Sequence, residues 1–229
     1  MLKSDLPMQE DMSTRDKTLY AGATLFFEKG YEKTTIVDIA DRAGVNRGSV
    51  VFAIKNKENL LYTLVSLVLE SVFYSSHLLV GETDDPVLRY AAEAALQLYM
   101  AESRDEVREL AVMTYTLPTT SELVYHKTAK RIMELFGAYN PNWAEKDFYE
   151  REIASGSIMR GYMAKPCDLY FTMERKMRLF LETTLLLYNV PEEKADEAEA
   201  FLSGFDFKTI ADRAMDRMLD VLKAQNYPK

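Results

Sequence analysis

One short segment of the sequence carries several side chains that can contact a nucleic acid. Arg47 and Ser49 can hydrogen-bond to base edges, and a contact between arginine and guanine would be the strongest single readout. Phe52 can make an apolar contact, for instance with a thymine methyl group. Lys55 and Lys57 carry positive charges that can bind phosphates without reading sequence. The alternative interpretation is that both lysines are only solvated surface charges. The same alternative carries more weight for Arg47.

The elements that must position these side chains follow from the spacing around them. Apolar periodicity predicts helices over residues 36–43, 47–54 and 57–80. Gly44 lies in the turn between the first two and lets the second helix cross the first at a steep angle. This layout is that of a helix-turn-helix, whose second helix places its N-terminal half in the major groove.

Local polar residues support these helix starts. Thr35 and Asp38 are three residues apart and resemble a capping box, with Asp in place of the usual Glu. Asn46 is a plausible N-cap for the second helix. We expect Thr35, at a helix N-terminus, to bind a phosphate. We also expect Gly48 to allow a close approach of the backbone to DNA.

The region Arg15–Leu61 resembles the DNA-binding domain of the tetracycline-repressor (TetR) family of bacterial transcription regulators. The order, spacing and turn chemistry agree across the whole region. The string Lys55-Asn56-Lys57 is similar to the family's turn before its connecting helix. The matching positions are Ala23, Phe26, Gly30, Tyr31, Thr35, Ile39, Ala40, Ala43, Gly44, Val45, Gly48, Lys57, Glu58 and Leu60.

Three positions of the second helix depart from the family pattern. Val51 and Ala53 stand where the family usually has tyrosines, and Ile54 replaces a usual phenylalanine. In the family, polar aromatic side chains of this helix contact DNA, so we expect Phe52 or Val51 to offer an apolar contact instead. The departures also leave an alternative function open. In that alternative, a helical protein of the same fold has weakened or lost DNA binding and acts through protein partners.

The resemblance implies three segments. Residues 1–13 are expected to be a flexible N-terminal tail, residues 14–60 the helix-turn-helix DNA-binding domain, and residues 61–229 a helical effector-binding and dimerisation domain. The overall charge of −8 and the pI of about 5.0 argue, taken alone, against a nucleic-acid binder. By segment, however, the charge is −2, +2 and −8. The basic excess therefore lies where the motif lies.

The rest of the chain predicts an all-α fold, because prolines and glycines separate segments of helical periodicity and no strand-like alternation persists. The stretch 60–80 is strongly apolar but contains Glu70 and His77, which favours a buried helix over a membrane span. No signal peptide is apparent. The further helices are predicted over 15–29, 86–101, 104–116, 120–138, 144–163, 167–188, 192–202 and 208–224.

The resemblance implies that the larger domain binds a small effector and shifts the two DNA-binding heads through the connecting helix 57–80. Methionine and aromatic side chains suit an adaptable, mainly apolar pocket, although ordinary core packing is the alternative for each of them. A hydrogen-bonded surface histidine is the alternative for His126. A neutral or cationic, largely apolar effector is favoured. The candidates for ligand binding are Met100, Met113, Tyr125, His126, Met133, Tyr162, Tyr170 and Met173.

The resemblance also implies a homodimer on a palindromic operator, joined by two C-terminal helices in a four-helix bundle. The best candidates are Ala144–Met163 and Cys167–Tyr188, with the last helix a competitor. The helix Cys167–Tyr188 has a largely apolar stripe. This stripe can face the partner or the subunit's own core, and both interpretations remain open.

The sequence gives no sign of an enzyme, a cofactor or a metal site. Cys167 is the single cysteine, which excludes an intrachain disulfide and is consistent with a reducing compartment. His77 and His126 are the two histidines, too few for a zinc site of the usual type. We therefore expect a cytoplasmic, ligand-responsive transcription regulator, most simply a repressor. Its partners would be double-stranded DNA, a small molecule and a second copy of itself, with no membrane.

Overall fold

The computed structural model describes residues 12–224, which form eleven α-helices and two short 3₁₀ segments with no β-strand among them. The prediction of an all-α fold is confirmed. The helices are α1 (Thr14–Lys29), α2 (Ile36–Ala43), α3 (Arg47–Ile54), α4 (Lys57–Val80), α5 (Pro86–Ser103), α6 (Asp105–Thr114), α7 (Pro118–Phe136), α8 (Glu145–Ala164), α9 (Met173–Leu187), α10 (Glu193–Leu202) and α11 (Phe207–Lys223); the 3₁₀ segments are Gly81–Thr83 and Gly137–Tyr139.

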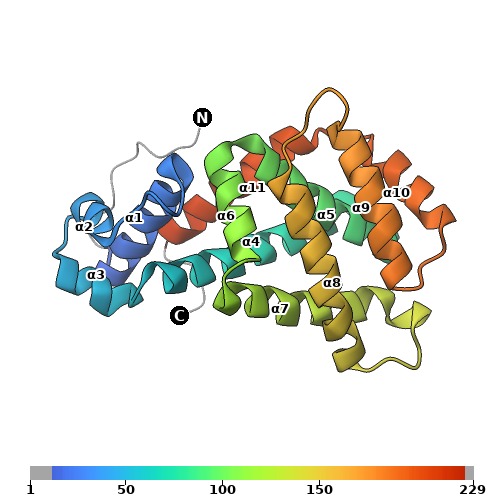
Figure 1. The fold of residues 1–229 in the computed structure, drawn as a ribbon, viewed down its shortest axis with the longest axis horizontal. Helices are drawn as coiled ribbons and strands as arrows, with labels where there is room; N and C mark the ends of the chain where they lie inside the picture. The colour runs from blue at the N-terminus through green and yellow to red at the C-terminus, as the bar shows by residue number, and fades with distance from the viewer. Residues whose placement is uncertain (1–11, 225–229) are drawn as a thin grey trace.

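The molecule is elongated, with α1, α2 and α3 grouped as a head at one end and α8, α9 and α10 at the other (Figure 1). Most of the expected tail, residues 1–11, lies outside the described residues. Of its last two residues, Met12 is buried and Ser13 caps α1 by accepting the Asp16 N–H. Met12 and Ser13 are therefore part of the head.

Helix α4 joins the head to the larger body of the molecule. It is long and apolar enough to cross a membrane by length and composition alone. Its apolar residues, however, include Leu60, Leu64 and Val72, which are buried against neighbouring helices. It packs on α1 and α3 at one end and on α5, α7 and α11 further along. These contacts are those of a core helix that belongs to both parts.

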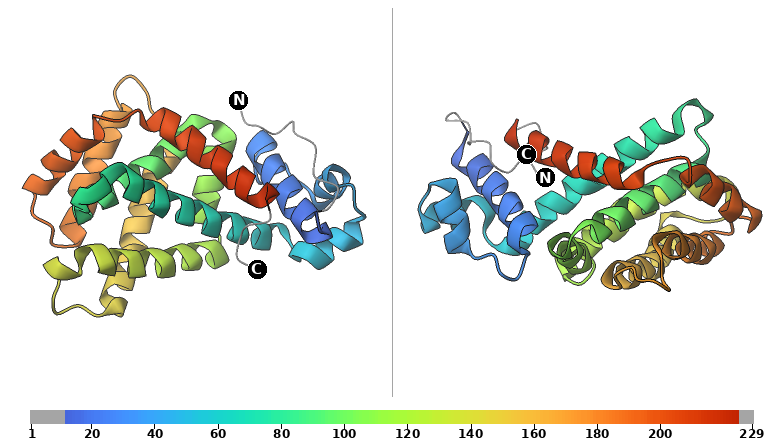
Figure 2. Two further views of the ribbon diagram at one scale, coloured as in Figure 1. Left: turned by 180° about the vertical axis from the view of Figure 1, so that it is seen from behind. Right: turned by 90° about the horizontal axis from the view of Figure 1, so that it is seen from above.

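Helix α11 returns from the body to the head. It packs against α5, α4 and α1, and Figure 2 shows its C-terminal end beside α1. Its apolar stripe, including Ala211, Met215, Met218 and Leu222, is buried in these contacts. The last helix therefore belongs to the core of this chain along much of its length.

The start of α9 corrects one prediction. Apolar periodicity predicts a helix from Cys167, but the structure begins it at Met173. The Asp168 carboxylate accepts the backbone N–H groups of Tyr170 and Phe171, which holds a turn that a helix would break. Thr172 then caps α9. Downstream, the stripe of α9 faces the core of its own chain, where Phe180 and its neighbours are buried.

Candidate DNA-binding surface and effector cavity

The junction between α2 and α3 has helix-turn-helix geometry. Thr35 Oγ1 accepts the Asp38 N–H at 3.1 Å, and Asp38 accepts the Thr35 N–H at 2.7 Å, so the predicted capping box is formed. Gly44 ends α2 in the left-handed region, with φ of 67°. Ile39 and Ala43 are buried at the crossing. The small apolar contact and the glycine turn therefore fix α3 across α2.

Helix α3 presents one exposed face. Arg47 and Gly48 are exposed at its start. Phe52 is 92% exposed, which is unusual for a large apolar side chain. Val51 is also exposed, whereas Ser49 is half-buried. Below this face, Val50 and Ile54 are buried in the head. The face is therefore held rigidly from beneath and is free to enter a groove.

Asn46 and Gly48 lie at the first turn of α3. The Asn46 side-chain oxygen accepts the Ser49 N–H at 2.8 Å, so the predicted N-cap is formed. A Cβ atom at Gly48 would lie 3.2 Å from the same oxygen. The glycine thus keeps space beside the cap, and the Asn46 side-chain oxygen is already engaged.

The two lysines after α3 differ in their surroundings. Lys55 is exposed and has φ of 62°. Lys57 is half-buried, and its Nζ donates to the Tyr31 carbonyl at 2.8 Å and lies 4.5 Å from the centre of that ring. Burial lowers the pKa of Lys57. Its ammonium group is therefore directed into the turn after α1, which sequence spacing alone did not indicate.

The N-terminus of α2 carries its own negative charge. Asp38 forms an ion pair with Lys29 at 2.7 Å and accepts a hydrogen bond from the Thr35 hydroxyl. The hydrogen bonds from Lys29 and Thr35 hold the pKa of Asp38 well below its usual range. A phosphate approaching Thr35 would meet this carboxylate.

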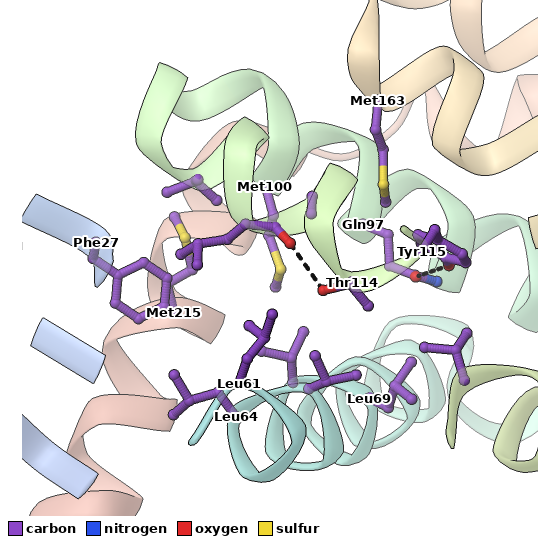
Figure 3. A pocket seen from close by; sticks show the side chains of 16 residues that line it. Phe27, Leu61, Leu64, Leu69, Gln97, Met100, Thr114, Tyr115, Met163 and Met215 are labelled. Carbon is purple, nitrogen blue, oxygen red and sulfur yellow. Dashed lines mark hydrogen bonds between the residues drawn. The ribbon is translucent and has the colours of Figure 1, made fainter. Parts of the chain in front are cut away.

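An apolar cavity of about 100 Å³ lies between the head and the body. Figure 3 shows leucines of α4 on one side, with Met100, Met163 and Met215 converging from α5, α8 and α11. Phe27 of α1 closes the end toward the head. Sulfur and aliphatic atoms dominate its walls, so it suits an apolar molecule whose shape the methionines can accommodate.

A second, more polar cavity of about 40 Å³ lies deeper in the body. Gln97 of α5 and Tyr115, directly after α6, line both cavities. The Tyr115 hydroxyl lies 3.4 Å from the Gln97 side-chain oxygen, to which it donates (Figure 3). This pair of side chains therefore forms part of the wall of both spaces.

Residues 19–63 match the family model described as bacterial regulatory proteins, tetR family. The helix-turn-helix head is that of the TetR family. Among curated relatives, the HTH-type transcriptional regulator TtgR of Pseudomonas putida is 31% identical over 128 residues, or 56% of this chain and 50% of that protein. The HTH-type transcriptional repressor KstR2 of Mycolicibacterium smegmatis is 38% identical over 69 residues, or 30% of this chain and 33% of that protein.

These matches cover at most about half the length of either relative. Solved structures show a similarity in fold over a larger part of the chain. RolR in complex with resorcinol superposes with a TM-score of 0.63 at 16% identity, covering 82% of this chain and 93% of that one. SmeT, the repressor of the Stenotrophomonas maltophilia multidrug efflux pump SmeDEF, gives 0.55 at 20% identity, covering 78% and 91%. The shared fold therefore extends well beyond the matched head.

One of the eight ligand-binding candidates lines the apolar cavity. Met100 does so, whereas the other seven line neither of the two cavities. Tyr170 is exposed, and His126 is exposed with Nε2 at 3.4 Å from a Glu122 oxygen. The remaining five, Met113, Tyr125, Met133, Tyr162 and Met173, are half-buried. The sequence pattern therefore does not show which residues border a void.

Sequence reasoning missed a contact between body and head. Glu109 of α6 accepts the backbone N–H of Glu32, in the turn after α1, at 2.7 Å. A Cβ atom at Gly30 would lie 2.3 Å from the same carboxylate. Nothing local marks Glu109, because its partner is 77 residues away. The contact ties α6, whose other side lines the apolar cavity, directly to the head.

Nothing in the described range suggests a metal centre. Within residues 12–224 there is no group of three or more histidine, cysteine or acidic side chains arranged to hold an ion. The names of the curated TetR-family relatives describe transcriptional regulators and repressors rather than enzymes.

Proposed function

We propose that this protein is a ligand-responsive transcriptional repressor. It binds a palindromic operator as a homodimer in the cytoplasm and is released by a small, largely apolar effector. The observation that carries the proposal is the apolar cavity, whose walls include both α4 and α6. These two helices also contact the head, so a molecule in the cavity touches the elements that hold the DNA-binding surface.

The DNA contacts are assigned to the exposed face of α3. Arg47, Ser49 and Phe52 face base edges, and Gly48 lets the backbone approach. Lys55 binds a phosphate and sets the register. Thr35 and Lys57 support the surface through their intramolecular hydrogen bonds, as does Asn46 through its cap. Any phosphate contact by Lys57 would replace its bond to Tyr31.

Release follows from movement between α4 and α6. Leu61 and Leu64 line the cavity from the start of α4, while Val107 and Leu110 line it from α6. An effector that separates these walls shifts Glu109 and the head relative to α4. Such a ligand lowers DNA affinity only to the extent that it binds the displaced state more tightly than the DNA-bound state.

The dimer interface is assigned to the outer faces of α8 and α9. Ile153 of α8 and Leu186 of α9 are large apolar side chains that are exposed in the single chain. Exposed small residues of α8, Ala154 and Gly161, would allow a close approach of two helices. The apolar stripe of α11 is already buried within the subunit, which supports α8 and α9 over the last helix.

The decisive experiment measures DNA binding by fluorescence anisotropy, using a labelled palindromic fragment from upstream of the protein's own coding sequence. We expect the affinity to fall steeply as KCl rises, because phosphate contacts release counterions. Arg47→Ala should cost about 1–3 kcal/mol. The matched control is Lys130→Ala, which removes an exposed charge of the body and should change nothing.

Two outcomes would contradict the proposal. Absence of binding even at low salt would favour the alternative of a protein that acts through protein partners. Equal losses for Arg47→Ala and Lys130→Ala would mean that the binding is non-specific attraction rather than recognition through α3.

Sedimentation velocity of Leu186→Glu tests the interface separately, because a charge at a two-fold contact should yield monomers.

A further inference from the structure

The polar cavity lies beside two buried carboxylates with different partners. Glu93 of α5 accepts hydrogen bonds from the Arg131 guanidinium at 2.7 and 3.0 Å and from the Ser76 hydroxyl at 2.9 Å. Glu152 of α8 is only 5% exposed, and its carboxylate accepts a hydrogen bond from the Tyr188 hydroxyl. Within residues 12–224, no lysine, arginine or histidine forms an ion pair with Glu152. One carboxylate is thus compensated and the other is not.

We propose that the polar cavity is a subsite for a protonated amine on the effector, with Glu152 as its counter-charge. This inference rests on the proposed function and names the effector class: an apolar body bearing one basic nitrogen. The apolar body would occupy the larger cavity. Because Gln97 and Tyr115 line both spaces, a chain of a few atoms passing between them joins the two subsites.

The charges around the cavity favour a cation over an anion. Arg131 is the one positive side chain that lines it among the described residues, and Arg131 already pairs with Glu93 and Glu134. Against this single positive charge stand Glu93 and Glu152. An anionic ligand would meet an excess of negative charge, whereas an ammonium group completes the balance. A buried charge without a partner is costly, and a matching ligand charge removes that cost.

Polar and aromatic groups in the wall can also bind an ammonium group. The Tyr90 hydroxyl is buried beside the cavity and has no hydrogen-bond partner among the described residues. Its oxygen can accept an N–H from the ligand. Phe73, Tyr115 and Phe180 supply ring surfaces, which attract cations through their π faces. The subsite thus holds a carboxylate, an unused hydroxyl group and aromatic rings.

Binding of a cation would change the protonation of Glu152. Burial is the main cause that raises the pKa of this carboxyl group, and Glu93 raises it further, while hydrogen bonds from Thr128 and Tyr188 lower it. A cation that enters beside Glu152 favours the carboxylate form over the neutral form, so binding shifts the carboxyl group toward ionisation and releases protons to solvent. The product is a carboxylate–ammonium pair, and the protons released are those that Glu152 carries in the free protein.

The ionisable groups that face Glu152 come from every helix around it. They are Tyr90 and Glu93 on α5, Tyr115 after α6, Tyr125 and Arg131 on α7, and Tyr188 after α9. Burial raises the pKa of each of these four tyrosines, so they stay neutral near pH 7. Arg131 stays charged. Glu93, whose pKa burial also raises, is held by Arg131.

The test compares three probes of one shape: 4-phenylbutylamine, 4-phenylbutan-1-ol and 4-phenylbutanoate. Isothermal titration calorimetry of the full-length protein at pH 7 should give the amine at least about tenfold tighter binding than the alcohol, and no binding of the carboxylate. Repeating the amine titration in buffers of different ionisation enthalpy should show proton release. Amine affinity should rise with pH until Glu152 is ionised in the free protein, whereas alcohol affinity should stay flat.

Glu152→Gln removes the charge but keeps an oxygen to accept from Tyr188. We expect the amine to lose about tenfold in affinity and the proton release to disappear, with the alcohol unchanged. The matched control is Glu134→Gln, an exposed carboxylate that also contacts Arg131 but lies outside the cavity. It should leave the preference for the amine intact. The wild-type comparison of the three probes stands even where a variant fails to fold.

Equal affinity for amine and alcohol, preference for the carboxylate, absence of amine binding, or an unchanged preference in folded Glu152→Gln would each overturn the proposal. These failures differ from a failure of the proposed function. Operator binding is measured without any probe, so a protein that binds DNA but ignores the amine loses only this inference. A protein that does not bind the operator loses the repressor assignment whatever the probes do.

Discussion

The exposed face of α3 and the interior around Glu152 place residues where globular proteins seldom put them. On α3 a phenylalanine, Phe52, is almost fully exposed, whereas in the body the carboxyl groups of Glu93 and Glu152 are buried. Both arrangements are unfavourable for folding alone. The first leaves an apolar ring ready for a groove, and the second leaves the Glu152 carboxyl group without a basic side chain as its partner. Each unfavourable placement therefore marks a surface that a ligand can complete.

The two regions also differ in how they are held. The head is stabilised by hydrogen bonds between residues close in sequence, such as Thr35 with Asp38 and Asn46 with Ser49. The interior of the body brings together residues from α5, α7, α8 and the end of α9. Removing a buried ring from the body should therefore lower the free energy of unfolding, whereas removing the exposed ring from α3 should lower DNA affinity.

Phe136→Ala should produce the largest effect. Phe136 is fully buried and packs against the rings of Tyr90 and Tyr188, with centroids 5.2 and 5.5 Å away. The loss of this side chain should lower the free energy of unfolding by about 3–5 kcal/mol. Urea unfolding followed by circular dichroism at fixed protein concentration measures it. A loss below about 1 kcal/mol would show that the cluster is not the core of the body.

Phe52→Ala is the matched exposed change, and its effect should appear in DNA binding alone. The free energy of unfolding should stay within about 0.5 kcal/mol of the wild type, because the ring packs against little. Operator affinity should fall by about 1 kcal/mol through loss of an apolar base contact. Anisotropy titration measures the second quantity. Unchanged operator binding would remove Phe52 from the recognition surface.

Glu109→Ala tests the contact that joins the two regions. The Glu32 N–H loses its acceptor, so the free energy of opening at that amide should fall by about 1 kcal/mol. Hydrogen exchange of the Glu32 amide, followed by NMR, measures this change. Glu106→Ala, on the same helix, is the control and should leave the amide protected. Equal exchange in both variants would mean that α6 does not hold the head through Glu109.

The pH dependence of stability should give the smallest effect. The folded-state pKa of Glu152 is raised above its ordinary value of 4.5. Its stabilising contribution is therefore complete below that value and is lost as pH rises toward the folded-state pKa. Glu152→Gln removes this loss, so its stability relative to wild type should increase from acidic to neutral pH. Urea titrations at both pH values test the sign, and a constant difference would contradict it.

Sequence alone determined the head more completely than the body, and the reason is the range of the interactions. The bounds of α2, α3 and α4 follow the predicted 36–43, 47–54 and 57–80, because each is set by a cap within three residues. The start of α9 was predicted six residues too early. There the Cys167 N–H donates to Glu102, 65 residues away, and no periodicity reveals such a partner.

The ligand-binding region shows the same limit. Helical periodicity correctly turns Met100 toward the interior, but a cavity exists only where several helices leave space together. Glu152 is one acid among many in an acidic segment, and its burial depends on Tyr188, 36 residues away. Lys57 looked like a phosphate ligand by position, whereas the fold gives its ammonium group to Tyr31. These residues acquire their roles only through tertiary contacts.

The packing of α11 against α1 bears on how the chain matures during synthesis. Near the end of α11, the Lys223 ammonium group lies 6.0 Å from the centre of the Tyr20 ring, in the first helix of the head. The ribosome makes α1 early and α11 last, so one side of α1 stays uncovered until translation is almost complete. Any shortened product that stops before Phe207 would carry the recognition helix but lack this cover. Such a fragment would be prone to aggregation and degradation.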